Sequence, residues 1–376
     1  MKNMSKISRV VLIIITIMLL IQLGVGNLVS AQDGCGNEEK KLPLPEKEEV
    51  TKIVEEIFKD RNRAILEHDL SLVKEHYNTK SKYGMWAYEY EEKKANYLHN
   101  WEEKQGAVFV EIKPKVVIKS LKGTSEKVNA YLMCSTEYQY MYEDNMEVTN
   151  VFRIGTDHTL TLAREGDKWI IVKEWYKDPF GDSLELKKLK SDDVKSFIMA
   201  QEAKDLEGIN ERRKGIIEYG KQFCGGATEE QYGFKYNKKY RNYNPEGGDC
   251  ANFASQMLHE GGKFKKNSVW NCDSSGATGP WVNAGGFKNY MVNSGRASVI
   301  AYGGYEKVYK AAYKMLPGDF VAYEAKGDIN HISMVTGLDS KGYPLVTCHN
   351  TDRYMVPWDL GWSNPKIKFW LVRTHC

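Results

Sequence analysis

Residues 247–262 read GGDCANFASQMLHEGG and place one cysteine between a glycine turn and a helix-forming run. Gly247 and Gly248 permit a tight turn, and Asp249 is a residue type that caps helix N-termini. We therefore expect Cys250 at the first helical position, where free backbone N–H groups and the helix dipole stabilise a thiolate and lower the thiol pKa. The pattern predicts that Cys250 is a nucleophile. The alternatives are that it forms half of a disulfide or is a buried thiol.

A cysteine nucleophile needs a base, and the stretch DINHISMVTGLD, residues 328–339, offers His331 at the beginning of a predicted strand. A histidine on a strand can face the helix end across a cleft, as cysteine peptidases require. The orienting third residue is expected in LVTCHNTD, residues 345–352, where His349 and Asn350 are the candidates. Because neighbouring strand residues point to opposite faces, only one of the two can serve. Cys348 is assigned to packing or a disulfide.

Further polar and aromatic residues near the cysteine are candidates for substrate binding. Asp249, Asn252 and Gln256 share the turn and helix of Cys250, and Trp281 stands in a later loop. A helix surface explains the polar residues equally well, and an aromatic residue in a loop often covers a core.

Three motifs together resemble the bacterial "putative amidase domain" family, which is related to the CHAP and NlpC-type peptidases of the papain-like clan. The motifs are GGDCANFASQMLHEGG, LPGDFVAYEAKGDINHISMVTGLD and CHNTDR. The resemblance covers residues 209–376. It implies a papain-like fold, a catalytic set of cysteine, histidine and a polar residue, and action on amide bonds, notably those of peptidoglycan. By motif, Cys250 is the implied nucleophile, His331 the base and His349 the third residue ahead of Asn350. One departure is Asn330, where the family often has aspartate.

Composition and charge narrow the class of protein. Of the 376 residues, 42% are hydrophobic and 27% charged, which is typical of a globular protein. Residues 209–376 hold 22 basic and 15 acidic residues, whereas residues 32–208 hold 28 and 35, so only the C-terminal half is basic. No pattern typical of nucleic-acid binding is present. The seven cysteines form no CxxC pair and no HExxH motif occurs, so neither a metal site nor a cofactor is predicted.

The first residues are typical of a secretory signal peptide. Lys2, Lys6 and Arg9 precede an apolar run, and Val29-Ser30-Ala31 fits a cleavage site. We expect export from a Gram-positive bacterium with cleavage after Ala31, and no stable membrane insertion afterwards. An uncleaved anchor is the alternative, although the run is shorter than the ~20 residues that a spanning helix needs.

The remaining chain predicts an α+β fold in two domains. After a signal peptide (1–31) and a linker (32–45), residues 46–183 show helical patterns and then four alternating stretches that predict antiparallel strands. This layout resembles the nuclear-transport-factor-like or cystatin-like roll, in which a curved sheet wraps over helices. Residues 184–208 predict a helical connector, and residues 209–376 the papain-like domain.

These observations predict a secreted cysteine amidase or peptidase that acts on cell-wall peptidoglycan or another peptide. Two alternatives remain open. The first is a wall-binding or spore-surface module that keeps the scaffold without turnover. The second is a cysteine acyltransferase, which shares the acyl-enzyme and differs in the acceptor.

Overall fold

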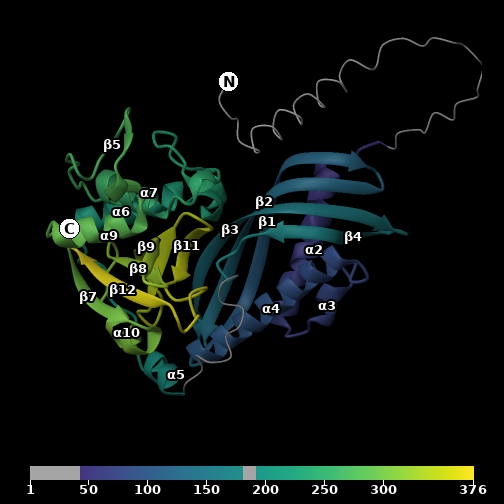
Figure 1. Cartoon of the computed structure of the whole chain (residues 1–376). Helices are drawn as coiled ribbons and strands as arrows, with labels where there is room; N and C mark the ends of the chain where they lie inside the picture. Colours follow the sequence, from purple (N-terminus) through teal and green to yellow (C-terminus); the bar gives the residue numbers. More distant parts are fainter. Residues whose placement is uncertain (1–42, 181–191) are drawn as a thin grey trace, which may run out of the picture. The chain divides into compact units, whose positions relative to one another are not determined.

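The computed structural model describes residues 43–180 and 192–376 (Figure 1). The helices are α2 (Lys47–Leu66), α3 (Ser71–Lys74), α4 (Lys82–Gln105), α5 (Asp192–Met199), α6 (Glu211–Phe223), α7 (Cys250–Gln256), α8 (Gly279–Val282), α9 (Ala284–Asn293) and α10 (Tyr305–Ala312). The strands are β1 (Ala107–Thr124), β2 (Lys127–Tyr142), β3 (Asn145–Glu165), β4 (Lys168–Tyr176), β5 (Cys272–Asp273), β6 (Gly276–Ala277), β7 (Ala297–Gly303), β8 (Phe320–Ala325), β9 (Asp328–Leu338), β10 (Pro344–Cys348), β11 (Asp352–Pro357) and β12 (Lys368–Thr374). The fold is α+β, as predicted.

The N-terminal half consists of helices that pack on an antiparallel sheet. Helix α2 buries Val50, Val54, Ile57 and Phe58, a 3–4 residue spacing that lines one helical face. Helix α4 starts at Ser81, whose hydroxyl accepts from the Gly84 N–H, and ends at Gly106 in a left-handed conformation. Strands β1 to β4 pair in sequence order, so the predicted helices and strand meander are confirmed.

The strands of both halves join in one sheet of ten strands. Its order is β1-β2-β3-β11-β10-β9-β8-β12-β7, with β4 pairing separately with β3. The connection between the halves is the antiparallel pairing of β3 with β11, in which Ile154 lies opposite Arg353. Accordingly, residues 43–180 and 192–376 belong to one compact unit. The sequence pattern predicts two domains but gives no sign that their sheets are continuous.

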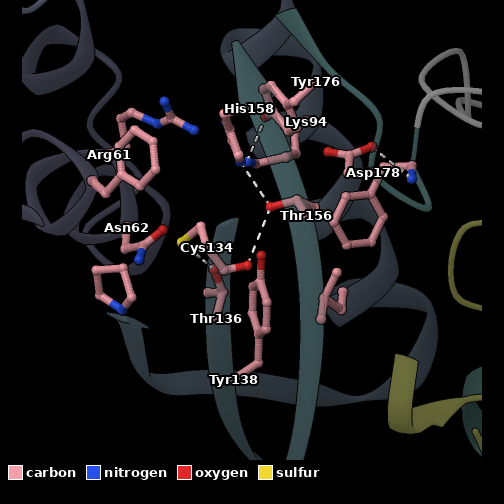
Figure 2. A pocket seen from close by; sticks show the side chains of 14 residues that line it. Arg61, Asn62, Lys94, Cys134, Thr136, Tyr138, Thr156, His158, Tyr176 and Asp178 are labelled. Atoms are coloured by element: carbon pink, nitrogen blue, oxygen red, sulfur yellow. Dashed lines mark hydrogen bonds between the residues drawn. The ribbon is translucent and has the colours of Figure 1, made fainter. Parts of the chain in front are cut away.

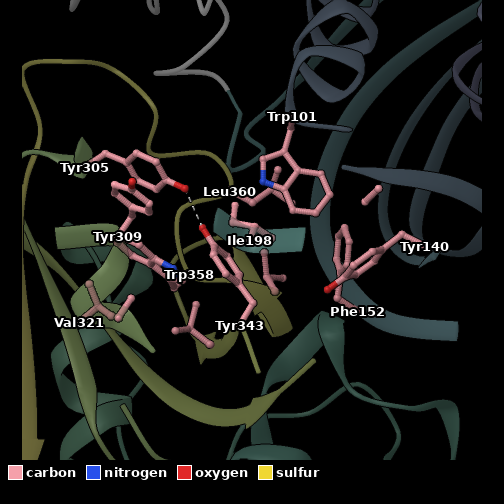
Figure 3. Close-up of a cluster of buried hydrophobic side chains, with 14 of the residues drawn as sticks. Trp101, Tyr140, Phe152, Ile198, Tyr305, Tyr309, Val321, Tyr343, Trp358 and Leu360 are labelled. Carbon is pink, nitrogen blue, oxygen red and sulfur yellow. Dashed lines mark hydrogen bonds between the residues drawn. The ribbon is translucent and has the colours of Figure 1, made fainter. Parts of the chain in front are cut away.

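A shared hydrophobic core reinforces this junction. Trp101, Tyr140 and Phe152 from the N-terminal half belong to the same buried cluster as Tyr343 and Trp358 from the C-terminal half (Figure 3).

Buried polar groups cross the same boundary. The hydroxyl groups of Tyr140 and Tyr142 donate to Asp339 over 2.8 and 2.6 Å, and the Lys104 ammonium group pairs with Asp359. Buried polar groups that are mutually satisfied in this way hold the halves in one arrangement.

Most predicted elements of the C-terminal half are confirmed, but several others are missed. The helices that the sequence predicts over 211–224 and 306–314 correspond to α6 and α10, and the strands predicted over 319–325, 331–338, 345–349 and 366–372 correspond to β8, β9, β10 and β12. Helices α8 and α9 and strands β5, β6, β7 and β11 are not anticipated. Strand β11 is preceded by Asn350 and Thr351 with positive φ angles of 70° and 67°, and it contains Met355 at 57°. These angles break the alternation by which a strand is recognised.

Several predicted segments fall outside the described residues. They are the signal peptide (1–31), most of the linker (32–45) and the start of the connector (184–208), of which α5 is the described helical part. Within the ranges that the structure covers, no helix is both long and apolar enough to cross a membrane.

Candidate active site

Cys250 is the first residue of α7, as predicted. Gly247 and Gly248 have φ angles of 122° and 139°, which favour glycine, and a Cβ atom on Gly248 would lie 2.8 Å from Nδ2 of Asn350. Asp249 occupies the N-cap position, but its carboxylate makes no capping hydrogen bond and instead accepts from the Tyr243 N–H at 2.9 Å. The cysteine therefore lies where the sequence predicts it, with the cap replaced by a longer-range contact.

The protonation state of Cys250 differs from the sequence-based expectation. The side chain is buried, and this burial raises the pKa of the thiol to about 12. The N–H groups of Ile332 and Ala251 face the sulfur and act in the opposite direction, but they do not overcome desolvation. The expected lowering of the pKa is thus wrong for this state, in which Cys250 is a neutral thiol. Cys250 is among the free cysteines, so a disulfide is not formed there.

His331 lies on β9 with its ring directed at a different cysteine from the one expected. Its Nε2 is 3.3 Å from Sγ of Cys348 on the neighbouring strand β10. If this nitrogen carries the hydrogen and donates to the sulfur, Nδ1 keeps its lone pair and can act as a base. Burial, followed by the charge of Arg353, lowers the pKa of His331 well below its ordinary value, which favours the neutral imidazole.

Cys348 therefore lies next to His331, where the sequence predicts His349 or Asn350 instead. Burial raises the pKa of the Cys348 thiol, and a neutral thiol is only a weak hydrogen-bond acceptor. The residue was missed because a cysteine on a buried strand is most simply explained by packing. The available signal was strand alternation, since Cys348 and His349 must face opposite sides of β10.

His349 is held by partners other than His331, and its predicted catalytic role stays a prediction. Its Nδ1 lies 2.6 Å from Oδ2 of Asp249, and its Nε2 lies 2.8 Å from the carbonyl oxygen of Phe223. Its ring stacks on Phe253 with centroids 3.6 Å apart. Both hydrogen-bond partners are acceptors, so a ring nitrogen that carries a hydrogen can donate to the oxygen it faces. His349 thereby ties the first turn of α7 to the end of β10 and is not in contact with His331.

All four of the predicted substrate-binding residues are enclosed by the protein. Asn252 donates to Asp249 over 2.8 Å and accepts from the indole N–H of Trp281 over 2.8 Å. Gln256 accepts from the hydroxyl group of Tyr219 over 2.9 Å. All are buried, as is Asp249. The structure thus brings Asp249, Asn252 and Trp281 together as support for α7, and their predicted contact with substrate remains a prediction.

A cleft of about 530 Å³ lies against His331. Asn350, which is exposed, and Arg353 line it from the C-terminal half, and Tyr90 and Asp178 line it from the N-terminal half. Of the predicted catalytic residues, His331 and Asn350 line this cleft, whereas Cys250 and His349 are not among its lining residues.

A second hollow in the N-terminal half is surrounded by polar groups but is much smaller. Thr156 and His158 form hydrogen bonds there, next to Cys134 and Lys94 (Figure 2). Its volume of about 20 Å³ holds roughly one water molecule. Substrate chemistry is therefore better placed in the larger cleft.

One group of possible metal ligands occurs within residues 43–180 and 192–376. Potential ligand atoms of His68, His99 and Glu102 lie within 4.8 Å of one another. The two imidazole rings stack nearly parallel, with centroids 3.7 Å apart and an interplanar angle of 14°. In this arrangement their lone pairs do not converge, so we assign no metal to the group. It lies outside the cleft beside His331.

Comparison with known proteins finds similarity in the C-terminal half. Residues 210–372 match the family model described as "Putative amidase domain". Two uncharacterised proteins of Bacillus subtilis (strain 168) are similar: YhbB, 30% identical over 153 residues (39% of this chain, 43% of YhbB), and YjcM, 31% identical over 141 residues (34% of this chain, 30% of YjcM). The match therefore spans less than half of either relative.

Several chains of solved structures are similar to part of this chain. An NTF-2-like protein of unknown function from Shewanella oneidensis MR-1 has 16% identity and covers 34% of this chain and 99% of its own, with a TM-score of 0.21. A score this low supports no conclusion about fold or function.

Proposed function

We propose that the amidase-like half hydrolyses amide bonds in bacterial peptidoglycan, with Cys250 as nucleophile and His331 as general base, and that the protein is exported. The family match supports an amidase, and the single observation that carries the cysteine mechanism is the position of Cys250. Its sulfur, at the start of α7, faces the N–H of Ile332, the residue next to His331. The nucleophile and the base are thereby held on adjoining segments.

The neutral state of both groups determines the order of the proposed steps. At rest Cys250 is a thiol and His331 a neutral imidazole. As the sulfur attacks the amide carbonyl carbon, its proton passes to Nδ1 of His331, and the imidazolium ion then protonates the leaving amine. The N–H groups of Ala251 and Ile332, which face the sulfur, are suitable donors to the developing oxyanion. Water then attacks the thioester and releases the acid and the free thiol.

The surface next to the cleft favours a substrate that carries sugar. Tyr90 and Tyr176 line both the cleft and a neighbouring groove of about 370 Å³, and the groove also holds Tyr83, Trp86 and Trp175. The last three are more than half exposed. Exposed aromatic rings of this kind mark ligand grooves, and their flat faces suit the C–H surface of a sugar ring. A peptide attached to a glycan would fill both hollows.

The test is hydrolysis of purified peptidoglycan by the full chain, followed by detection of new amino groups and mass spectrometry of the fragments. We expect release by the wild-type protein and its loss in Cys250→Ala. Cys272→Ala is the matched control, because Cys272 is a partly exposed free cysteine on the short strand β5, and it should retain activity.

Three outcomes would contradict parts of this proposal. Activity in Cys250→Ala would exclude the cysteine mechanism. Binding to walls without any release would favour the non-catalytic module. Fragments joined to an added amine would identify an acyltransferase.

A further inference from the structure

Arg353 is a buried cation next to the proposed base. It is 4% exposed, and its Nε and Nη1 atoms are buried without a hydrogen-bond partner among the described residues. The neighbouring carboxylate of Asp352 is occupied elsewhere, since it accepts from the Gly226 N–H over 2.7 Å and from the hydroxyl group of Tyr236. A guanidinium group remains charged at any physiological pH, and a buried charge without a partner is costly. Arg353 is therefore suited to an anion brought by a ligand.

The planar guanidinium group is selective in what it binds. Its donors match the two oxygens of a carboxylate, which they can hold through paired hydrogen bonds. One side of the group is already covered by the ring of Trp362, whose centroid lies 5.1 Å from the central carbon of Arg353. Both residues line the cleft. A carboxylate in the cleft would give Arg353 the partner that it lacks.

Asp178 supplies the opposite charge from the other half of the chain. Its Oδ1 accepts from the hydroxyl group of Tyr90 over 2.7 Å and from the Phe180 N–H over 2.9 Å. Its Oδ2 is buried without a hydrogen-bond partner among the described residues. Figure 2 shows Asp178 at the edge of the N-terminal hollow, and it also lines the cleft. An ammonium group has the donors that this oxygen requires.

We propose that the cleft binds a zwitterionic α-amino acid group, with its carboxylate on Arg353 and its ammonium group on Asp178. The inference deepens the proposed function and rests on it: the substrate would be a side-chain amide whose amine part ends in a free amino acid group. Such a group carries both charges on one carbon atom. It would satisfy two buried groups of opposite sign that do not pair with each other, and it would be recognised jointly by the two halves of the chain.

Three small probes test this directly, measured by calorimetry on the full-length Cys250→Ala variant so that turnover does not interfere. Nε-acetyl-lysine carries the zwitterion and a side-chain amide. Its C-terminal amide lacks the carboxylate, and Nα,Nε-diacetyl-lysine lacks the ammonium group. We expect Nε-acetyl-lysine to bind at least about tenfold more tightly than either analogue, because each analogue leaves one buried charge unpaired.

Variants assign the two charges separately. Arg353→Gln should remove the preference for the carboxylate and keep that for the ammonium group, and Asp178→Asn should do the reverse. Lys177→Gln is the matched control, because Lys177 lines the same cleft but is exposed, and it should keep both preferences. Thermal unfolding shows whether each variant is folded. The comparison of the three probes on the Cys250→Ala protein does not depend on these further substitutions.

The results separate this inference from the proposed function. Equal affinity for the three probes, or no binding of any, would overturn the zwitterion site even if peptidoglycan is hydrolysed. The expected binding pattern in a protein that hydrolyses no amide would support the site and refute the proposed function.

Discussion

Arg61 and Arg353 are both buried arginines, 5% and 4% exposed, but their surroundings differ. Arg61, in the N-terminal half, lies 3.0 Å from Glu91 and 3.0 Å from Glu174. Glu174 in turn binds His158 at 2.8 Å. Arg353, beside the cleft, leaves two nitrogen atoms without a partner in the described chain.

The difference separates structural charge from charge that is available to a ligand. Burial opposes the ionisation of Glu174, but Arg61 and His158 lower its pKa below the ordinary value. The Arg61 group is thus satisfied within the protein. The Arg353 guanidinium group lacks such compensation, and at the neighbouring His331 burial lowers the pKa instead, which favours the neutral ring. The comparison predicts that changes in the first region affect folding and changes in the second affect activity.

The largest expected effect is on turnover, and it tests the region around Arg353 and His331 beside the cleft. His331→Gln should lower kcat/KM for amide hydrolysis by about 10³-fold, because the thiol of Cys250 then has no base. The melting temperature should change little. His375→Gln is the control: the ring of this exposed histidine forms hydrogen bonds with Gly295 and Ser298, and the variant should retain activity. A His331→Gln variant with activity within tenfold of wild type would remove His331 from the mechanism.

The second effect is on stability and tests the region around Arg61, where the buried charges are paired. Glu174→Ala leaves His158 buried without its carboxylate and Arg61 with Glu91 alone, so the free energy of unfolding should fall by about 3–5 kcal/mol. Urea denaturation measures it, and hydrolysis by the folded fraction should be near wild type. Glu75→Ala removes an exposed pair with Lys168 and should change stability by less than about 1 kcal/mol. Equal effects of the two changes would show that the buried pairs are not structural.

A smaller effect is expected at His349, which belongs to the C-terminal half but is paired like Arg61. His349→Ala removes the contacts with Asp249 and Phe223 and should lower stability by about 2 kcal/mol, with a modest loss of kcat. The pH dependence of kcat/KM should be unchanged, because His349 does not touch His331. A displaced acidic limb in this variant would restore His349 as the residue that orients the base.

The smallest effect is a displacement of the pH profile. In the proposed mechanism His331 acts in its neutral form, and burial and the Arg353 charge lower its pKa. Activity should therefore persist as the pH falls below the ordinary histidine value and be lost only at lower pH. In Arg353→Gln the charge is absent but the burial remains. The acidic limb of kcat/KM should therefore move to higher pH, yet stay below the ordinary value. No displacement, or one to lower pH, would mean that Arg353 does not act on the base.

The elements that were predicted correctly are those with a local signal. Helix α2 and the strands β1 to β4 follow hydrophobic periods of 3.6 and 2, and the turn before Cys250 follows from two glycines. The third residue of the site was not predictable in this way. Whether Cys348 or His349 faces His331 depends on the register of β10 against β9, which a strand of five residues does not reveal.

The sequence by itself determined the α+β class, the helix that presents Cys250, and the strand that carries His331, because these depend on residues close together in the chain. Only the tertiary structure decided that β3 and β11 join the two halves in one sheet, that the thiol of Cys250 is neutral, and that Asp178 and Arg353 share a cleft. These three results depend on which groups from distant parts of the chain come into contact. Strands about two hundred residues apart must pair, side chains must lose their water, and charges must find or lack a partner, and none of this can be predicted from a local sequence pattern.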